Sequence, residues 1–209
     1  MRTKVLLILF IAGLTQFCSA QVIETALDKR VKEFLDSQRQ SWHDWNVSYD
    51  DGQILYDLII KNGYTKALEI GTSTGHSSIW IAWALSKTDG RLITLEINAD
   101  RRAKALKYFE QAGLSDYIDA QLGDAHQIVK RLQGPFDFIF SDADKAWYKQ
   151  YFVDLYPKLL PGGCFTAHNV RNAYGGIKDF LDYVQEHPNM ETTIDKTSRS
   201  GISISYKKR

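Results

Sequence analysis

Cysteine and net charge are scarce in this chain, and each shortage removes a class of protein. Two of the 209 residues are cysteines, Cys18 and Cys164, so neither a framework of several disulfides nor a Cys-x-x-Cys motif is possible. The 26 Lys and Arg residues nearly balance the 25 Asp and Glu residues, and the formal net charge is +1. Because no basic run is interleaved with aromatic residues either, we expect no nucleic-acid partner.

Repeats, low-complexity tracts and Pro/Gly-rich linkers are also missing from residues 21–209, and the whole chain has only four prolines. Nothing in the composition therefore marks a domain boundary. With 44% apolar residues, a chain of this length can bury one sizeable core. We expect residues 21–209 to form a single domain.

No apolar run near the N-terminus is long enough to cross a bilayer comfortably. Arg2 and Lys4 precede the apolar run Val5–Leu14, and the small residues Cys18–Ala20 stand before Gln21. This order predicts a secretory signal peptide over residues 1–20, and hence export to a periplasmic or extracellular location. An uncleaved N-terminal anchor and an ordinary buried helix are the alternatives. Contact with a membrane is expected only through this segment.

Short apolar runs alternate with helical stretches along most of the chain. Strand-like runs occupy residues 67–70, 92–97, 117–122, 136–140 and 163–167, and helical patterns occupy residues 21–40, 52–62, 77–86, 99–111, 125–132, 147–160 and 174–186. This alternation predicts an α/β fold with a Rossmann-like, mostly parallel, doubly wound sheet. The last runs, 192–196 and 202–206, are joined by a short turn, which predicts a terminal antiparallel hairpin.

The first strand ends in a glycine turn, Gly71-Thr-Ser-Thr-Gly75, and a helical pattern starts at Ser77. Strand, turn and helix in this order present backbone N–H groups to a nucleotide-like cofactor. Ser73 stands where Gly-x-Gly-x-x-Gly has its second glycine, and no P-loop lysine follows Gly75. The turn therefore favours a nucleoside cofactor without phosphates over NAD, and Glu96 at the end of the next strand-like run can accept ribose hydroxyls. A plain strand-to-helix turn remains the alternative.

Two further strands end in polar residues. Asp142 and Lys145 follow the strand over 136–140, and His168-Asn169 follows the strand over 163–167. Because parallel strands end at one edge of the sheet, Asp142, His168 and Asn169 could converge on one cation. The alternatives are a surface ion pair between Asp144 and Lys145 and a structural histidine.

Together these motifs resemble the cation-dependent O-methyltransferases of the catechol and caffeoyl-CoA group over about residues 40–206. The motifs are Asn46–Gln53, Leu68–Gly71 with Gly75–Ser77, Leu92–Asn98, Gly123–Ala125, Ser141–Lys145 and His168–Asn169. The resemblance implies a class I methyltransferase fold. It also implies transfer of a methyl group from S-adenosylmethionine to a hydroxyl of a small catechol-like aromatic diol, assisted by a divalent metal. Similar proteins are often homodimers, and the helix over residues 21–40 is the expected contact.

The resemblance assigns a role to each matching position. Expected around the cofactor are Val47, Glu69, Gly71 and Ser77 at its methionine part, Glu96 at the ribose, Asp124, Ala125 and His126 at the adenine, and also Asp142. Expected at the acceptor are Asp142, His168 and Asn169 as metal ligands and Lys145 as the general base.

The chain departs from the family pattern at His168, where relatives carry Asp. Imidazole disfavours magnesium and calcium and favours zinc, iron, nickel or cobalt, so the identity of the metal is open. The departure and the signal-like segment together support an alternative function. In that alternative, the protein is an exported, non-catalytic small-molecule or metal-binding protein that keeps the methyltransferase fold.

Overall fold

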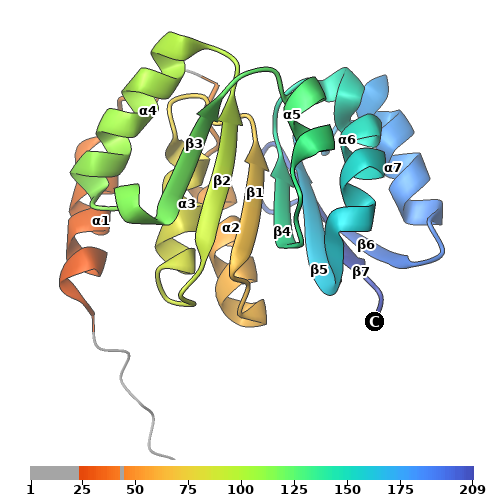
Figure 1. Ribbon diagram of the computed structural model, residues 1–209, viewed down its shortest axis with the longest axis horizontal. Coiled ribbons are helices and arrows are strands. Elements are labelled where there is room, and N and C mark those ends of the chain that lie inside the picture. Colours follow the sequence, from red (N-terminus) through yellow and green to blue (C-terminus); the bar gives the residue numbers. More distant parts are fainter. Residues whose placement is uncertain (1–23, 43–44) are drawn as a thin grey trace, which may run out of the picture.

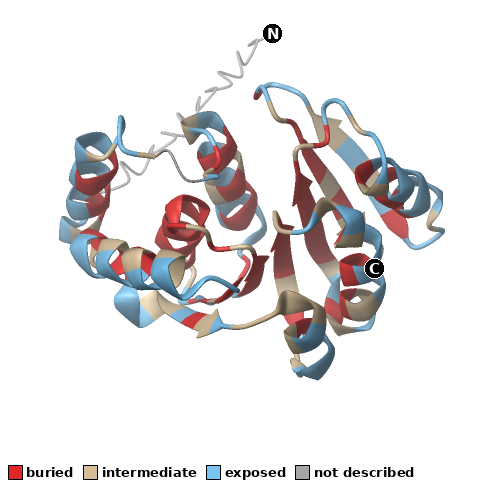
Figure 2. Ribbon diagram, turned by 90° about the horizontal axis from the view of Figure 1, so that it is seen from above, coloured by how far each residue is buried: buried red, intermediate tan, exposed pale blue. Residues whose placement is uncertain are grey.

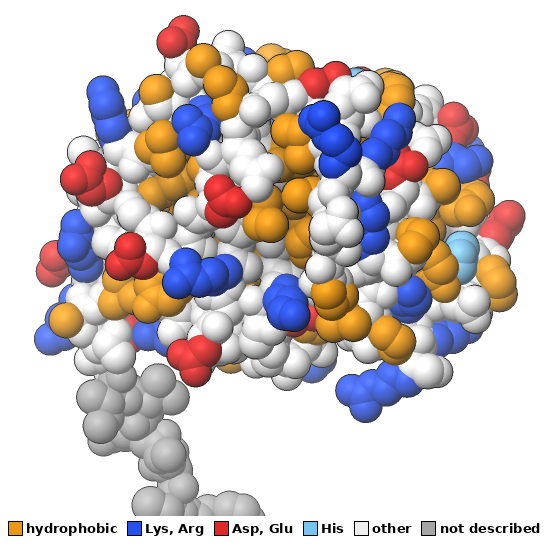
Figure 3. All heavy atoms as spheres, in the orientation of Figure 1, with side chains coloured by type: hydrophobic (Ala, Val, Ile, Leu, Met, Phe, Trp, Pro, Cys, Tyr) orange, Lys and Arg blue, Asp and Glu red, His pale blue; other side chains and the backbone are white. Residues whose placement is uncertain are grey.

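The computed structural model describes residues 24–42 and 45–209, so the predicted signal segment lies outside the described residues. Among the described helices, none combines the length and the apolar character that crossing a membrane requires. On the face shown in Figure 3, acidic and basic side chains are interspersed, as the nearly balanced charge leads one to expect.

A seven-stranded sheet in the order β3-β2-β1-β4-β5-β7-β6 forms the centre of the molecule (Figure 1). Its strands are β1 (Lys66–Ile70), β2 (Arg91–Glu96), β3 (Ile118–Leu122), β4 (Phe136–Ser141), β5 (Leu159–His168), β6 (Met190–Asp195) and β7 (Ile202–Lys207). β1 to β5 are parallel, and β7 runs antiparallel to both β5 and β6. The predicted fold class and terminal hairpin are confirmed.

Helices cover both faces of this sheet (Figures 1 and 2). They are α1 (Ala26–Ser37), α2 (Tyr49–Asn62), α3 (His76–Leu85), α4 (Ala99–Ala112), α5 (Ala125–Arg131), α6 (Tyr148–Leu155) and α7 (Gly176–Glu186). Successive strand residues point to opposite faces. Leu68 and Ile139 therefore pack with α6 and α7, whereas Phe138 and Phe140 pack with α2 and α3. Both faces of β1 and β4 are buried, which explains why their sequences are continuous apolar runs.

Several element boundaries differ from the sequence prediction. Side-chain caps explain where α1 and α2 begin. The predicted helix over 21–40 begins at Ala26, because Thr25 and Asp28 form a capping box there. A second box, Ser48 with Asp51, starts α2 at Tyr49 rather than at residue 52. The predicted helix over 147–160 is wrong at its end. It stops at Leu155, a 3₁₀ turn containing Pro157 follows, and β5 begins at Leu159.

The sheet order places the ends of β1, β4 and β5 side by side. Because these strands are parallel, Gly71, Asp142 and His168 are brought to one edge. β7 adds to this edge from the other direction, since Ile202 pairs with His168 and the loop between β6 and β7 therefore lies beside the end of β5. Open α/β sheets place ligands at such an edge.

Candidate active site

A cavity of about 680 Å³ opens at the carboxyl edge of the sheet, a size that suits a small-molecule site. Most of the predicted site residues line it: Gly71, Glu96, Asp124, Ala125, His126, Asp142, Lys145, His168 and Asn169. The other three, Val47, Glu69 and Ser77, are buried and do not line it. The structure thus gathers residues from five strand ends and from the segment before α2.

The glycine turn forms the floor of the cavity between β1 and β4. Gly71 has φ +101°, and a Cβ on this residue would lie 2.7 Å from the backbone oxygen of Asp142. Only glycine allows β1 and β4 to approach so closely at their ends. Asp142 in turn donates its backbone N–H to the carbonyl of Ile70 at 2.9 Å. The turn and the acidic strand end are therefore one rigid unit.

Glu69 lies fully buried beneath this turn. Its carboxylate accepts hydrogen bonds from the hydroxyls of Ser77 and Thr94, both at 2.5 Å, and from Ser78. Burial raises the pKa of Glu69 to about 7, even though the three hydroxyls favour its charged form. Glu69 thus ties the first turn of α3 to β1 and β2. Its predicted role near the methionine part of a cofactor stays a prediction.

Glu96 lines the cavity beside the glycine turn, at the end of β2. Its two carboxylate oxygens accept the backbone N–H groups of Ser73 at 2.7 Å and Asn98 at 3.0 Å. A carboxylate has about four acceptor positions, so about two remain for ligand hydroxyls. The same contacts hold the glycine turn and the loop after β2 in place. The geometry therefore suits the predicted contact with both hydroxyls of a ribose.

The residues expected around adenine form the next part of the wall. Asp124 caps α5 by accepting the backbone N–H of His126 at 2.9 Å. The His126 ring stacks on Trp147 with centroids 3.9 Å apart, and its nitrogens lie 3.4 Å from carboxylates of Asp124 and Asp144. This wall combines a planar surface with acceptors, which suits an aromatic base that carries an amino group.

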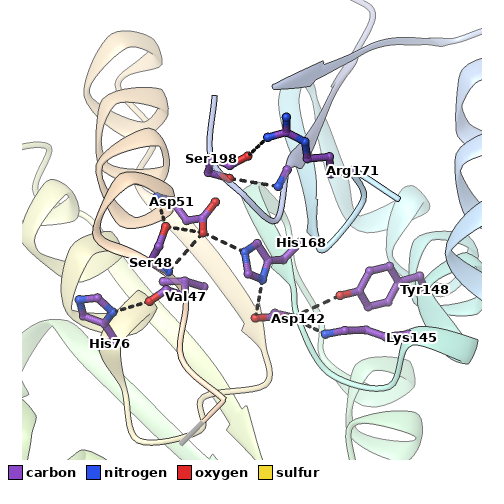
Figure 4. A network of polar contacts seen from close by, with 11 residues as sticks. Val47, Ser48, Asp51, His76, Asp142, Lys145, Tyr148, His168, Arg171 and Ser198 are labelled. Carbon is purple, nitrogen blue, oxygen red and sulfur yellow. Dashed lines mark hydrogen bonds and ion pairs between the residues drawn. The ribbon is translucent and has the colours of Figure 1, made fainter. Parts of the chain in front are cut away.

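The acceptor end of the cavity holds a chain of charged side chains (Figure 4). Nδ1 of His168 lies 3.1 Å from Asp142 Oδ2, and Nε2 lies 3.1 Å from Asp51 Oδ2. The second of these contacts is an ion pair that is poorly aligned as a hydrogen bond. Asp142 Oδ1 contacts the amine of Lys145 and lies 3.5 Å from the hydroxyl of Tyr148.

The two carboxylates decide the charge of His168. Burial by itself lowers its pKa, but the hydrogen bonds and charges of Asp142 and Asp51 raise it to about 9. For Asp51, burial raises the pKa, and His168, Ser198 and Ser48 together lower it to about 2. At neutral pH the structure therefore holds an imidazolium between two carboxylates.

Asp51 is the site residue that sequence reasoning missed. It lies within the motif Asn46–Gln53, but its spacing from Ser48 points only to a helix cap, which it also forms. The contact with His168 joins the start of α2 to the end of β5. No pattern along the chain signals it. Arg101 also lines the cavity without having been singled out from the sequence.

The predicted metal centre is not confirmed. A metal ion needs an in-plane lone pair on a ring nitrogen, yet a carboxylate oxygen lies 3.1 Å from each nitrogen of His168. Among residues 24–42 and 45–209, no three His, Cys, Asp or Glu side chains are arranged to hold a metal ion. The residues present therefore do not fit the divalent cation that the motifs led us to expect.

The sheet order, its antiparallel last strand and the cavity at the carboxyl edge define the fold of class I methyltransferases. The chain belongs to the O-methyltransferase family, whose model matches residues 18–188. An O-methyltransferase from Bacillus cereus, solved in complex with SAH, is similar at 29% identity and a TM-score of 0.75, with 87% of this chain and 91% of that chain covered. An O-methyltransferase from Streptomyces achromogenes, solved with SAM, reaches 25% identity and a TM-score of 0.72 over the same shares.

The relatives with similar sequences include a catechol O-methyltransferase and caffeoyl-CoA O-methyltransferases. A catechol O-methyltransferase from Niastella koreensis is 40% identical over 129 residues, which are 60% of this chain and 58% of the relative. A caffeoyl-CoA O-methyltransferase from Eucalyptus globulus is 35% identical over 158 residues, which are 71% of this chain and 64% of the relative. The match thus covers about three fifths of the length of these relatives.

Proposed function

We propose that this protein transfers a methyl group from S-adenosylmethionine to a hydroxyl of a small catechol-like aromatic. One observation carries the proposal: Glu96 with the glycine turn and Lys145 with Asp142 face the same cavity. The first pair suits a nucleoside, and the second suits an ionisable hydroxyl. Membership of the O-methyltransferase family and its relatives solved with SAM and SAH support the cofactor.

The proposed chemistry needs positioning and the removal of one proton. A sulfonium methyl group is already activated, so the protein must place the acceptor oxygen in line with it. Lys145 is 39% exposed at its side chain and contacts Asp142. Its neutral amine would accept the acceptor proton, and the carboxylate of Asp142 would stabilise the ammonium that forms. The metal-assisted version predicted from the motifs has no support in the arrangement of His168, so no step is assigned to a metal.

Calorimetry with S-adenosylmethionine on the purified chain tests the cofactor. We expect saturable binding, and a lack of binding at millimolar cofactor would refute the proposal. Transfer is then tested by mass spectrometry of products from a panel of catechols and simple phenols. A mass gain of one methyl group on an aromatic oxygen is the expected result.

A second function is a non-catalytic protein that binds a small molecule with the same cavity. His168 favours it, because the chain departs from the family pattern at an acceptor-side position. This function predicts binding of cofactor or aromatic ligand without any methylated product. Product from any member of the panel would exclude it.

Export is a separate proposal, supported by Arg2, Lys4 and the apolar run Val5–Leu14. Fractionation of cells that express the full chain tests it, and an uncleaved chain in the membrane fraction would favour the anchor instead. Export raises a question of supply, because S-adenosylmethionine is made in the cytoplasm. The homodimer, for which α1 is the expected contact, is tested by light scattering.

A further inference from the structure

Three acidic or basic side chains from three separate elements form a row at the acceptor end of the cavity (Figure 4). Asp51 comes from the first turn of α2, His168 from the end of β5, and Asp142 follows β4. Asp51 is 0% exposed and His168 is 4% exposed. Both contacts of the row are 3.1 Å long. Water therefore screens these charges little.

The position of the ring decides what His168 can do. A neutral imidazole carries one N–H, so its second nitrogen would turn a lone pair toward a carboxylate oxygen at 3.1 Å. With an N–H on both nitrogens, each faces an acceptor. A ring in that state has no lone pair for a metal ion. The geometry thus sets both ring nitrogens of His168 against carboxylates, Nδ1 in a hydrogen bond with Asp142 and Nε2 in an ion pair with Asp51, and a metal ion at either nitrogen would have to displace a carboxylate.

The charges around Asp142 are already balanced by the protein. Asp142 contacts Lys145 through Oδ1 and His168 through Oδ2, while Asp51 contacts His168 from the other side. Two carboxylates thus face two basic side chains, an imidazole and an amine. Because both oxygens of Asp142 already contact these side chains, a divalent ion bound to Asp142 would have to displace one of them. Such a position is unfavourable in a site with little water.

We infer that His168, held between Asp51 and Asp142, takes the place of the divalent cation in this chain, so that no divalent metal binds at Asp142, His168 and Asn169. The acceptor oxygen then meets basic side chains of the protein in place of a metal ion. Because no ion chelates two neighbouring hydroxyls, the site has no need of a diol, and an acceptor with a single aromatic hydroxyl is sufficient. This consequence for the acceptor rests on the proposed methyl transfer, whereas the absence of metal binding does not.

Metal titration tests the inference without any assay of activity. The full chain is treated with EDTA, dialysed and titrated with magnesium, manganese, cobalt and zinc in a calorimeter. We expect no saturable binding that depends on Asp142, and the Asp142→Asn variant should give the same traces as the parent. Saturable binding that Asp142→Asn abolishes would overturn the inference.

The variant His168→Asp tests whether His168 prevents a divalent metal from binding. It leaves carboxylate and amide oxygens at these positions, a set that suits magnesium and manganese. We expect the folded variant to gain manganese binding that the parent lacks, with no gain in the matched variant His187→Asp at the end of α7. A folded His168→Asp variant without such binding would count against the inference. If three neighbouring carboxylates prevent folding, the titration of the parent chain still decides the question.

Measurement of the methyl-transfer rate is a second, independent test of the inference. EDTA should leave the rate of methyl transfer unchanged, added magnesium should not raise it, and phenol should be methylated as well as catechol. A rate that EDTA abolishes and a divalent metal restores would overturn the inference. If no acceptor is methylated under any condition, the proposed function fails, while the metal titration still gives its own answer.

Discussion

The ring of His76 donates a hydrogen bond from Nδ1 to the backbone carbonyl of Val47 at 2.9 Å. The indole N–H of Trp80 donates to the other ring nitrogen, Nε2, at 3.1 Å. One nitrogen is thus a donor and the other an acceptor, which defines a neutral ring and a single tautomer. Trp42 stacks on the same ring with centroids 4.4 Å apart. The segment before α2 is therefore attached to the first turn of α3, directly behind the cavity.

The neutral state of His76 predicts a loss of stability in acid. Burial lowers its pKa from 6.5 to about 4. Between these two pH values the unfolded chain binds a proton at His76 and the folded chain does not. The contribution of His76 to the free energy of unfolding is therefore complete above pH 6.5 and is lost as the pH drops toward 4. The contribution is about 3 kcal/mol at most. Urea unfolding at several pH values measures it. In His76→Phe the slope of stability against pH in this window should decrease, whereas His187→Asn should keep the parental slope.

Glu96→Gln should weaken cofactor binding. The amide removes a charged acceptor and turns a donor toward either Ser73 or Asn98, whose N–H groups the carboxylate now accepts. Loss of hydrogen bonds to a charged group predicts an increase in the Kd for S-adenosylmethionine of about 10- to 100-fold. Calorimetry measures the change, and Glu110→Gln on the exposed side of α4 serves as the control. An unchanged Kd would remove Glu96 from the cofactor site.

Lys145→Ala separates chemistry from binding. Its amine contacts Asp142 at the end of β4, whereas Glu96 lies at the end of β2. Loss of a general base predicts a fall in kcat of about 10²–10⁴-fold with an unchanged Kd for the cofactor. Lys149→Ala, an exposed lysine on α6, is the matched control. Turnover close to that of the parent would exclude Lys145 as the base.

Gly71→Ala should destabilise the fold more than the same change at Gly63. Both glycines have positive φ, but a Cβ at Gly63 meets nothing within 4 Å, whereas at Gly71 it meets the backbone of Asp142 at 2.7 Å. Gly63→Ala should therefore cost only the backbone term, about 1–2 kcal/mol. Gly71→Ala adds a clash that moves the end of β4. Urea unfolding measures the loss of stability in both variants, and cofactor calorimetry shows whether the site is distorted. Equal losses of stability in Gly71→Ala and Gly63→Ala would contradict the prediction.

Much of this architecture is readable along the chain. Apolar runs that alternate with helical patterns predict the parallel sheet, because each run must be covered on both faces. The short turn after residue 196 predicts the antiparallel last strand. Gly71, Glu96, Asp142 and His168 follow strands, and strands of a parallel sheet end at one edge. The order and direction of the strands are therefore sufficient to predict that these residues meet at one cavity.

The contacts of the His168 ring could be learned only from the tertiary structure. Its residue type predicted a metal ligand, but a ligand requires a free ring nitrogen, and only the folded chain shows what faces each nitrogen. Asp51 reaches Nε2 because α2 begins beside the end of β5, a contact between segments far apart in the sequence. Local patterns determine which residues lie at the edge of the sheet, since they specify strands and turns. The partner of each side chain depends on how those elements pack, and that packing places His168 between two carboxylates.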